Sequence, residues 1–215
     1  MRGLSVLFWG MPLALVICVT TGVAGVGGLS FDALRRFGII PSMLTTAWIL
    51  YGLGQLGCFQ KQERIWTRAL DRARLLALVN FGLSPFLFWW NRHPDETYFR
   101  TAVEVLAISA LVFLAHLNLV LRRLTAMLPD EHLREETRQF TVMNRMMVLV
   151  ILGLAILLKL FLKFPEIFPS LGNYLERIEP SGLWVIMFLV LLPMAITMAL
   201  IWKIKEVILE GVFGR

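Results

Sequence analysis

The stretch TAVEVLAISALVFLAHLNLVL, residues 101–121, contains one carboxylate and no lysine or arginine, and basic residues flank it at Arg100, Arg122 and Arg123. A helix rises about 1.5 Å per residue, so about 20 apolar residues cross the hydrocarbon core of a bilayer, which is about 30 Å thick. Inside that core a helix satisfies its own backbone hydrogen bonds. Residues 101–121 therefore predict a membrane-spanning helix.

Five further apolar blocks have the same character: residues 4–29, 40–59, 75–90, 146–164 and 183–202. The whole chain agrees with this pattern, because 58% of its 215 residues are hydrophobic and 17% are charged, whereas a soluble domain carries about 25% charged residues. The mean hydropathy is +0.72. We expect an all-α integral membrane protein, with residues 1–215 forming one polytopic domain of about six spans.

The lysines and arginines predict how the spans are oriented, because short cytoplasmic loops are enriched in positive charge. One side of the predicted bundle holds Arg2, five residues within 61–74, five within 122–145, and Lys203, Lys205 and Arg215, which is 14 of the 21 basic residues. This distribution predicts that both termini are cytoplasmic, in a bacterial cytoplasmic (inner) membrane. It favours contact with the phosphates of the bilayer over binding of nucleic acid.

 The basic residues lie in short loops between apolar blocks, and we therefore expect anionic lipid headgroups and no nucleic acid as their partners.

Two segments are expected to form helices on the cytoplasmic side, residues 60–74 and 122–145. The first precedes the shortest block, residues 75–90, and reads as an extension of the same helix. In the second, Pro129 and Asp130 followed by Glu131 predict a helix start, because proline fits early helical positions and carboxylates complement the positive end of the helix dipole. We expect that helix to run on into the span at residues 146–164.

Arginines recur every four residues in the first of these segments, at Arg64, Arg68 and Arg72, so they share one helical face. Apolar residues from Ile65 to Ala73 are expected on another face. Such an amphipathic helix binds either anionic lipid or an acidic partner, and the sequence favours neither. That partner would be a membrane protein, a cytoplasmic protein or a second copy of the chain. The candidate docking residues are Arg64, Arg68, Arg72, Arg122, Arg123, Arg134 and Arg138.

Polar residues inside predicted spans are costly and are therefore candidate functional sites. Asn80 lies six residues from Arg74 and His116 lies six residues from Arg122, so each is about 9 Å from the cytoplasmic side. We expect these two side chains to face each other, with Asn118 as a third member. Such a group forms either a structural hydrogen bond, which we favour, or a proton relay or substrate contact.

A second pair is expected near the outer side of the membrane. Glu104 lies four residues beyond Arg100, and Lys159 lies five residues before Phe164, so the two side chains are at similar depths. They would form an ion pair that neutralises both charges, or Lys159 would extend to the headgroups. A gate or ion-binding role is the alternative.

Prolines interrupt three of the spans, and glycines lie in a fourth. Gly52, Gly54 and Gly57 would let helices approach closely. Pro12, Pro85 and Pro193 each remove a backbone hydrogen bond from a span.

Several chemistries have no support in the sequence. The three histidines, His93, His116 and His132, fall in three different compartments, so they cannot form one metal or haem site. No glycine-rich phosphate loop or catalytic motif is present. We therefore expect no enzymatic activity, no catalytic residues, no metal and no cofactor. The first hypothesis is a non-enzymatic membrane subunit or scaffold; the alternative is a small transporter or channel with a polar path between the third, fourth and fifth spans.

Overall fold

The computed structural model describes residues 2–23, 37–58, 63–93, 95–128, 130–163 and 191–210, and within these ranges the chain is helical apart from short turns, with no strand. The helices are α1 (Arg2–Val23), α3 (Ile40–Leu56), α4 (Arg64–Leu83), α5 (Pro85–Arg92), α6 (Thr97–Ala126) and α7 (Glu131–Lys163). A further helix covers residues 191–210. The expected all-α class is confirmed.

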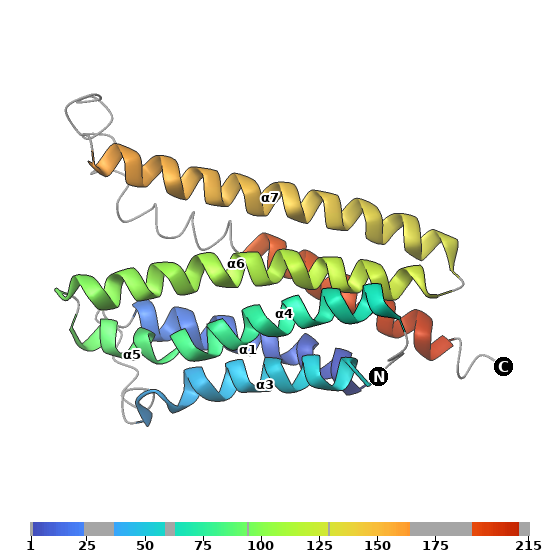
Figure 1. The fold of residues 1–215 in the computed structure, drawn as a ribbon, viewed down its shortest axis with the longest axis horizontal. Coiled ribbons are helices and arrows are strands. Elements are labelled where there is room, and N and C mark those ends of the chain that lie inside the picture. The colour runs from blue at the N-terminus through green and yellow to red at the C-terminus, as the bar shows by residue number, and fades with distance from the viewer. Residues whose placement is uncertain are drawn as a thin grey trace.

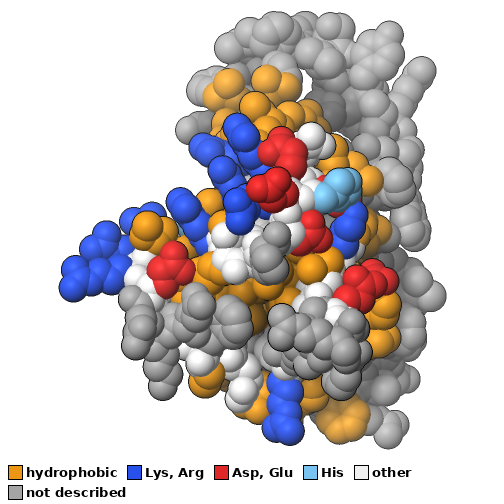
Figure 2. Space-filling model, turned by 90° about the vertical axis from the view of Figure 1, so that its right-hand side faces the viewer, with side chains coloured by type: hydrophobic (Ala, Val, Ile, Leu, Met, Phe, Trp, Pro, Cys, Tyr) orange, Lys and Arg blue, Asp and Glu red, His pale blue; other side chains and the backbone are white. Residues whose placement is uncertain are grey.

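The helices lie side by side along the long axis of the molecule (Figure 1). At one end α1, α4 and α7 begin and α3, α6 and helix 191–210 finish. We call this the basic end, because it carries most of the described basic side chains, and Figure 2 views it end-on. These residues are Arg2, Arg64, Arg68, Arg72, Arg74, Arg122, Arg123, Arg134, Arg138, Arg145, Lys203 and Lys205.

Four helical stretches among the described residues are long and apolar enough to cross a membrane: Arg2–Thr21, Arg64–Arg92, Thr97–Ala126 and Glu131–Leu157. The block expected at residues 40–59 appears as α3, which has 17 residues. The block expected at residues 183–202 is described only from residue 191. Residues 24–29, 59 and 164, which the expected spans also included, lie outside the described residues.

Large apolar side chains are exposed around the bundle, which is the reverse of a soluble protein. Examples are Trp9 on α1, Leu75 on α4 and Val150 on α7, which are 68%, 63% and 63% exposed. A second set of apolar residues packs inside, among them Leu53, Trp66 and Leu117, each 0% exposed. An exposed apolar surface of this kind is consistent with integration into a membrane.

Proline divides the block expected at residues 75–90 into two helices. Because Pro85 has no backbone N–H, the helical ladder is interrupted there, and α4 ends at Leu83 while α5 begins at Pro85. The hydroxyl of Ser84 donates a 2.9 Å hydrogen bond to the carbonyl oxygen of Phe81. Pro12, in contrast, lies within a continuous α1.

The long helix expected after Pro129 is present. The carboxylate of Asp130 accepts a 3.1 Å hydrogen bond from the backbone N–H of Leu133, which caps the start of α7. From Glu131 the helix continues for 33 residues to Lys163. At about 1.5 Å per residue it is about 50 Å long, which exceeds the thickness of a hydrocarbon core.

Of the three glycines Gly52, Gly54 and Gly57, which lie in α3 or directly after it, two are in close contact with a neighbouring helix. A Cβ atom on Gly52 would lie 3.0 Å from Val6 Cγ1, and one on Gly57 would lie 1.9 Å from the guanidinium of Arg74. Gly54 has no neighbour within 4 Å of such an atom. On the facing helix, a Cβ atom on Gly3 would lie 2.9 Å from the carbonyl oxygen of Gly52. The close approach of α1 and α3 therefore depends on Gly3 and Gly52.

Candidate functional site: the basic end and a buried polar cluster

Three helices meet at one buried hydroxyl group, that of Thr197 in helix 191–210. Its oxygen accepts hydrogen bonds from the side-chain amides of Asn118 in α6 (2.8 Å) and Asn144 in α7 (3.0 Å). The same hydroxyl donates to the carbonyl oxygen of Pro193 at 2.7 Å. Thr197 and Asn144 are 0% exposed and Asn118 is 1% exposed. We call Asn118, Asn144 and Thr197 the polar cluster.

The hydroxyl of Thr197 has its hydrogen-bonding capacity filled, because a hydroxyl offers one hydrogen and two lone pairs. The amide of Asn118 also donates to the carbonyl oxygen of Leu114 at 2.9 Å. The Oδ1 atoms of Asn118 and Asn144 are buried without a hydrogen-bond partner among the described residues. The cluster can therefore hold α6, α7 and helix 191–210 together, because breaking it would leave buried amides unpaired.

Sequence reasoning named Asn118 but missed Asn144 and Thr197. Asn144 lies next to Arg145 at the margin of an apolar block, where a polar residue is unremarkable. A threonine in a span commonly bonds to its own helix, as Thr197 does to Pro193. The only sequence signal was a polar side chain in each of three neighbouring helices.

Asn80 and His116 do not hydrogen-bond to each other in the structure. The Nδ1 atom of His116 lies 3.0 Å from the carbonyl oxygen of Val112 in its own helix, and Oδ1 of Asn80 is buried with no partner among the described residues. Ring contacts set the alignment of this helical pair: Phe86 lies 6.3 Å from Phe99. Counting back from Phe86 in α5 into α4, and forward along α6 from Phe99, places Asn80 level with about residue 105 rather than 116.

Glu104 forms an ion pair with Arg100 on the preceding turn of α6, with 3.6 Å between Oε1 and Nε. Lys159 is within α7, but its side chain lies outside the described residues. The expected pair of Glu104 and Lys159 therefore stays a prediction.

At the basic end, Arg64, Arg68 and Arg72 lie on the exposed face of α4. No ion pair involves these three side chains within the described part of the chain. The opposite face packs inward, with Trp66 and Ala73 both 0% exposed. Ile65 departs from the expected apolar face.

Ile65 is 56% exposed, because it lies one position from Arg64 on the outer side of the helix. Other basic residues at this end already have partners. Arg74 donates from Nη2 to the carbonyl oxygens of Leu53 and Gly54, at 3.2 and 3.3 Å, and so caps α3.

Arg134 also caps a helix, because its Nη2 donates to the carbonyl oxygens of Ala126 (3.3 Å) and Leu128 (3.4 Å) at the end of α6. Arg138 lies 3.7 Å from the carboxylate of Glu135. Arg122 and Arg123 are exposed, and no ion pair among the described residues includes either. Of the candidate docking residues, Arg64, Arg68, Arg72, Arg122 and Arg123 are therefore available to a partner.

An ion pair that the sequence did not indicate joins α7 to helix 191–210. The ammonium of Lys203 binds the carboxylate of Glu136, and the ring of His132 lies 3.7 Å from the same carboxylate oxygen. Lys205 is also engaged, with its Nζ atom 5.7 Å from the centre of the Trp202 ring. Both lysines of this helix therefore have intramolecular partners.

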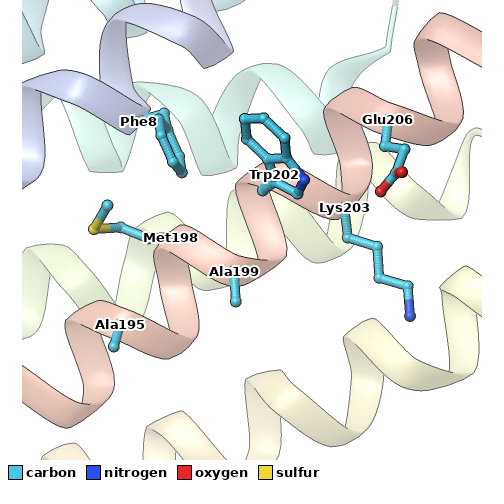
Figure 3. Close-up of a pocket in the computed structure, with 7 residues that line it drawn as sticks. All are labelled: Phe8, Ala195, Met198, Ala199, Trp202, Lys203 and Glu206. Carbon is cyan, nitrogen blue, oxygen red and sulfur yellow. The ribbon is translucent and has the colours of Figure 1, made fainter.

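A shallow groove runs between α1 and helix 191–210 (Figure 3). Phe8 and Trp202 lie beside each other there, with ring centres 5.5 Å apart. Lys203 points toward α7 and away from these rings (Figure 3). The groove is lined by Phe8, Ala195, Met198, Ala199, Trp202, Lys203 and Glu206.

Within the described ranges, no group of three or more histidine, cysteine, aspartate or glutamate side chains could hold a metal ion. Comparison with known proteins gives no relative, because the chain matches no protein-family model, no curated protein and no solved structure. The functional argument therefore rests on the basic end, the polar cluster and the groove.

Proposed function

We propose that this chain is a non-enzymatic integral membrane subunit or scaffold whose basic end docks an acidic partner or anionic lipid headgroups. The observation that carries the proposal is the row of exposed arginines on α4. Arg64, Arg68 and Arg72 have no ion pair among the described residues, and a cation without a partner favours an anion from outside the chain.

The outer face of α4 changes from charged to apolar within one turn, and this change supports a location at the membrane surface. After Arg72, the exposed residues of that face are Leu75 and Leu78, which are 63% and 56% exposed. A boundary of this kind matches the border between headgroups and hydrocarbon. The arginines would then lie at the depth of the lipid phosphates.

We further propose six spans with both termini on the cytoplasmic side of a bacterial cytoplasmic membrane. The spans would be α1, α3, α4 with α5, α6, α7, and the helix that includes residues 191–202. Arg100 and Arg122 bracket about 33 Å of α6, close to the thickness of a hydrocarbon core. The start of α1 and the end of helix 191–210 lie at the same end of the bundle (Figure 1), which supports an even number of spans.

The alternative, a small transporter with a polar path near His116, has less support. Such a path requires polar side chains that water can reach, whereas Asn80 is 8% exposed and Asn118 is 1% exposed. The groove between α1 and helix 191–210 does not include either residue. These observations favour the scaffold.

The test is to replace the three arginines and measure which lipids and proteins stay bound. The variant Arg64→Gln/Arg68→Gln/Arg72→Gln is purified in mild detergent from membranes containing phosphatidylglycerol and phosphatidylcholine, and the retained molecules are identified by mass spectrometry. Each basic residue near an anionic surface contributes about 1 kcal/mol. We expect the preference for phosphatidylglycerol, or the acidic protein partner, to be lost.

The matched control is Arg92→Gln/Arg100→Gln, which removes exposed cations from the opposite end of the bundle. It should leave retention unchanged. If the triple variant kept the same lipids and protein partners as the natural chain, the proposal would be refuted.

A further inference from the structure

Helix 191–210 carries an exposed stripe that borders the groove beside α1, where Phe8 of α1 lies next to Trp202. Its members are separated by steps of three or four residues, so they lie along one side of the helix. The first half of the stripe is apolar or small and the second half ends in carboxylates. In order they are Leu192, Ala195, Ala199, Trp202, Glu206 and Glu210, and all are exposed.

The charged half of this stripe presents negative charge, because the lysines nearby have partners within the chain. Lys203 is held by Glu136 and Lys205 lies over the Trp202 ring. Glu206 and Glu210 have no ion pair among the described residues. Two copies of the stripe facing each other in the same membrane orientation would bring like charges together, so the complementary surface must carry positive charge.

The exposed face of α4 provides a surface of that kind. Its stripe has the same steps of three and four residues, and the sequence of steps is identical when α4 is read from its end toward its start. A Cβ atom on Gly82 would meet nothing within 4 Å, so this position is open. The members are Gly82, Val79, Leu75, Arg72, Arg68 and Arg64, and all are exposed.

We propose that helix 191–210 of one copy docks antiparallel against α4 of a second copy. One register pairs every position: large residues meet small ones, a cation meets an aromatic ring, and cations meet carboxylates. The inference rests on the proposed function, because it names a partner for the arginines of α4. The pairs are Leu192 with Gly82, Ala195 with Val79, Ala199 with Leu75, Trp202 with Arg72, Glu206 with Arg68, and Glu210 with Arg64.

The orientation of the two helices suits a membrane. Helix 191–210 finishes at the basic end and α4 begins there, so two copies standing the same way in the bilayer present the helices antiparallel. In the end-on view, basic side chains project at the left, and acidic side chains lie near the centre and at both sides (Figure 2). Each copy therefore offers two different faces, and a contact between different faces leads to rings or rows of copies.

A charge exchange tests the register. Donor- and acceptor-labelled full-length chains are reconstituted in phosphatidylcholine vesicles, which contain no anionic lipid, and association is measured by energy transfer. We expect Glu206→Arg alone and Arg68→Glu alone each to weaken association about tenfold. The double variant Arg68→Glu/Glu206→Arg should restore it, which a variant that merely unfolds the chain would not do.

Cross-linking tests the apolar half of the contact. In a background with Cys18→Ala and Cys58→Ala, which removes the two free cysteines, a chain carrying both Leu75→Cys and Ala199→Cys should form disulfide-linked species of three or more copies. Replacing Ala199→Cys by Leu149→Cys, which alters another exposed position, on α7, should abolish these species.

The proposal is overturned if the chain is monomeric in these vesicles, if the charge exchange fails to restore association, or if Ala199→Cys alone cross-links to itself. Failure of this inference is distinguishable from failure of the proposed function. Glu206→Arg leaves the arginines of α4 intact, so retention of anionic lipid would persist in the earlier assay even where the copies no longer associate.

Discussion

Removing the hydroxyl of Thr197 tests the polar cluster most directly. Thr197→Val keeps the shape of the side chain and deletes the oxygen atom that joins Asn118 to Asn144. The bond to the carbonyl oxygen of Pro193 is lost as well. Two buried amide groups then each have an N–H without its partner.

The expected cost follows from the two hydrogen bonds between helices. In membranes such a bond contributes about 0.6 kcal/mol, so two contribute about 1.2 kcal/mol. A buried polar group left unpaired costs about 1–3 kcal/mol. We therefore expect Thr197→Val to lower the free energy of unfolding by about 1–4 kcal/mol.

The assay is reversible unfolding in mild detergent by titration with sodium dodecyl sulfate, followed by circular dichroism. Thr141→Val is the matched control, because Thr141 is also buried and its hydroxyl donates within α7, to the carbonyl oxygen of Thr137 at 2.7 Å. Adding Asn118→Leu and Asn144→Leu to Thr197→Val should recover stability, since no polar atom is then stranded. Equal effects of Thr197→Val and Thr141→Val would refute the reasoning.

Two further predictions concern packing and capping. Gly3→Ala should destabilise the bundle by about 1–3 kcal/mol, because its Cβ would lie 2.9 Å from the carbonyl oxygen of Gly52; Gly54→Ala, with open space around it, should be neutral or stabilising in the same unfolding assay. Asp130→Ala should cost about 1 kcal/mol by removing the cap of Leu133 N–H, whereas Asp130→Asn should retain most of the stability. A destabilising Gly54→Ala, or an Asp130→Ala variant as stable as the natural chain, would contradict the respective argument.

Local features of the chain were predictable because they depend on residues close together in sequence. The start of α7 follows from Pro129 and Asp130, and the apolar block at residues 101–121 lies within α6. The exposed arginines of α4 follow from their spacing of four. The break at Pro85 was expected as well, although its result, two separate helices, required the structure.

The contacts between helices were not predictable in the same way. Counting residues gives the depth of a side chain along its own helix, but two residues meet only if both helices are also rotated and shifted correctly. The ring contact between Phe86, in α5 just after α4, and Phe99 of α6 indicates that shift, and it places Asn80 away from the level of His116. The meeting of Asn118 with Asn144 and Thr197 depends on the rotation of three helices at once.

The sequence by itself determined that this protein is helical, that long apolar helices suit a membrane, and that positive charge gathers at one end. These properties follow from composition and from periodicity along a single helix. Only the tertiary structure decided which buried polar groups pair, which basic side chains cap helices, and which faces stay exposed. Those outcomes depend on side chains distant in sequence, whose positions are set by packing between helices.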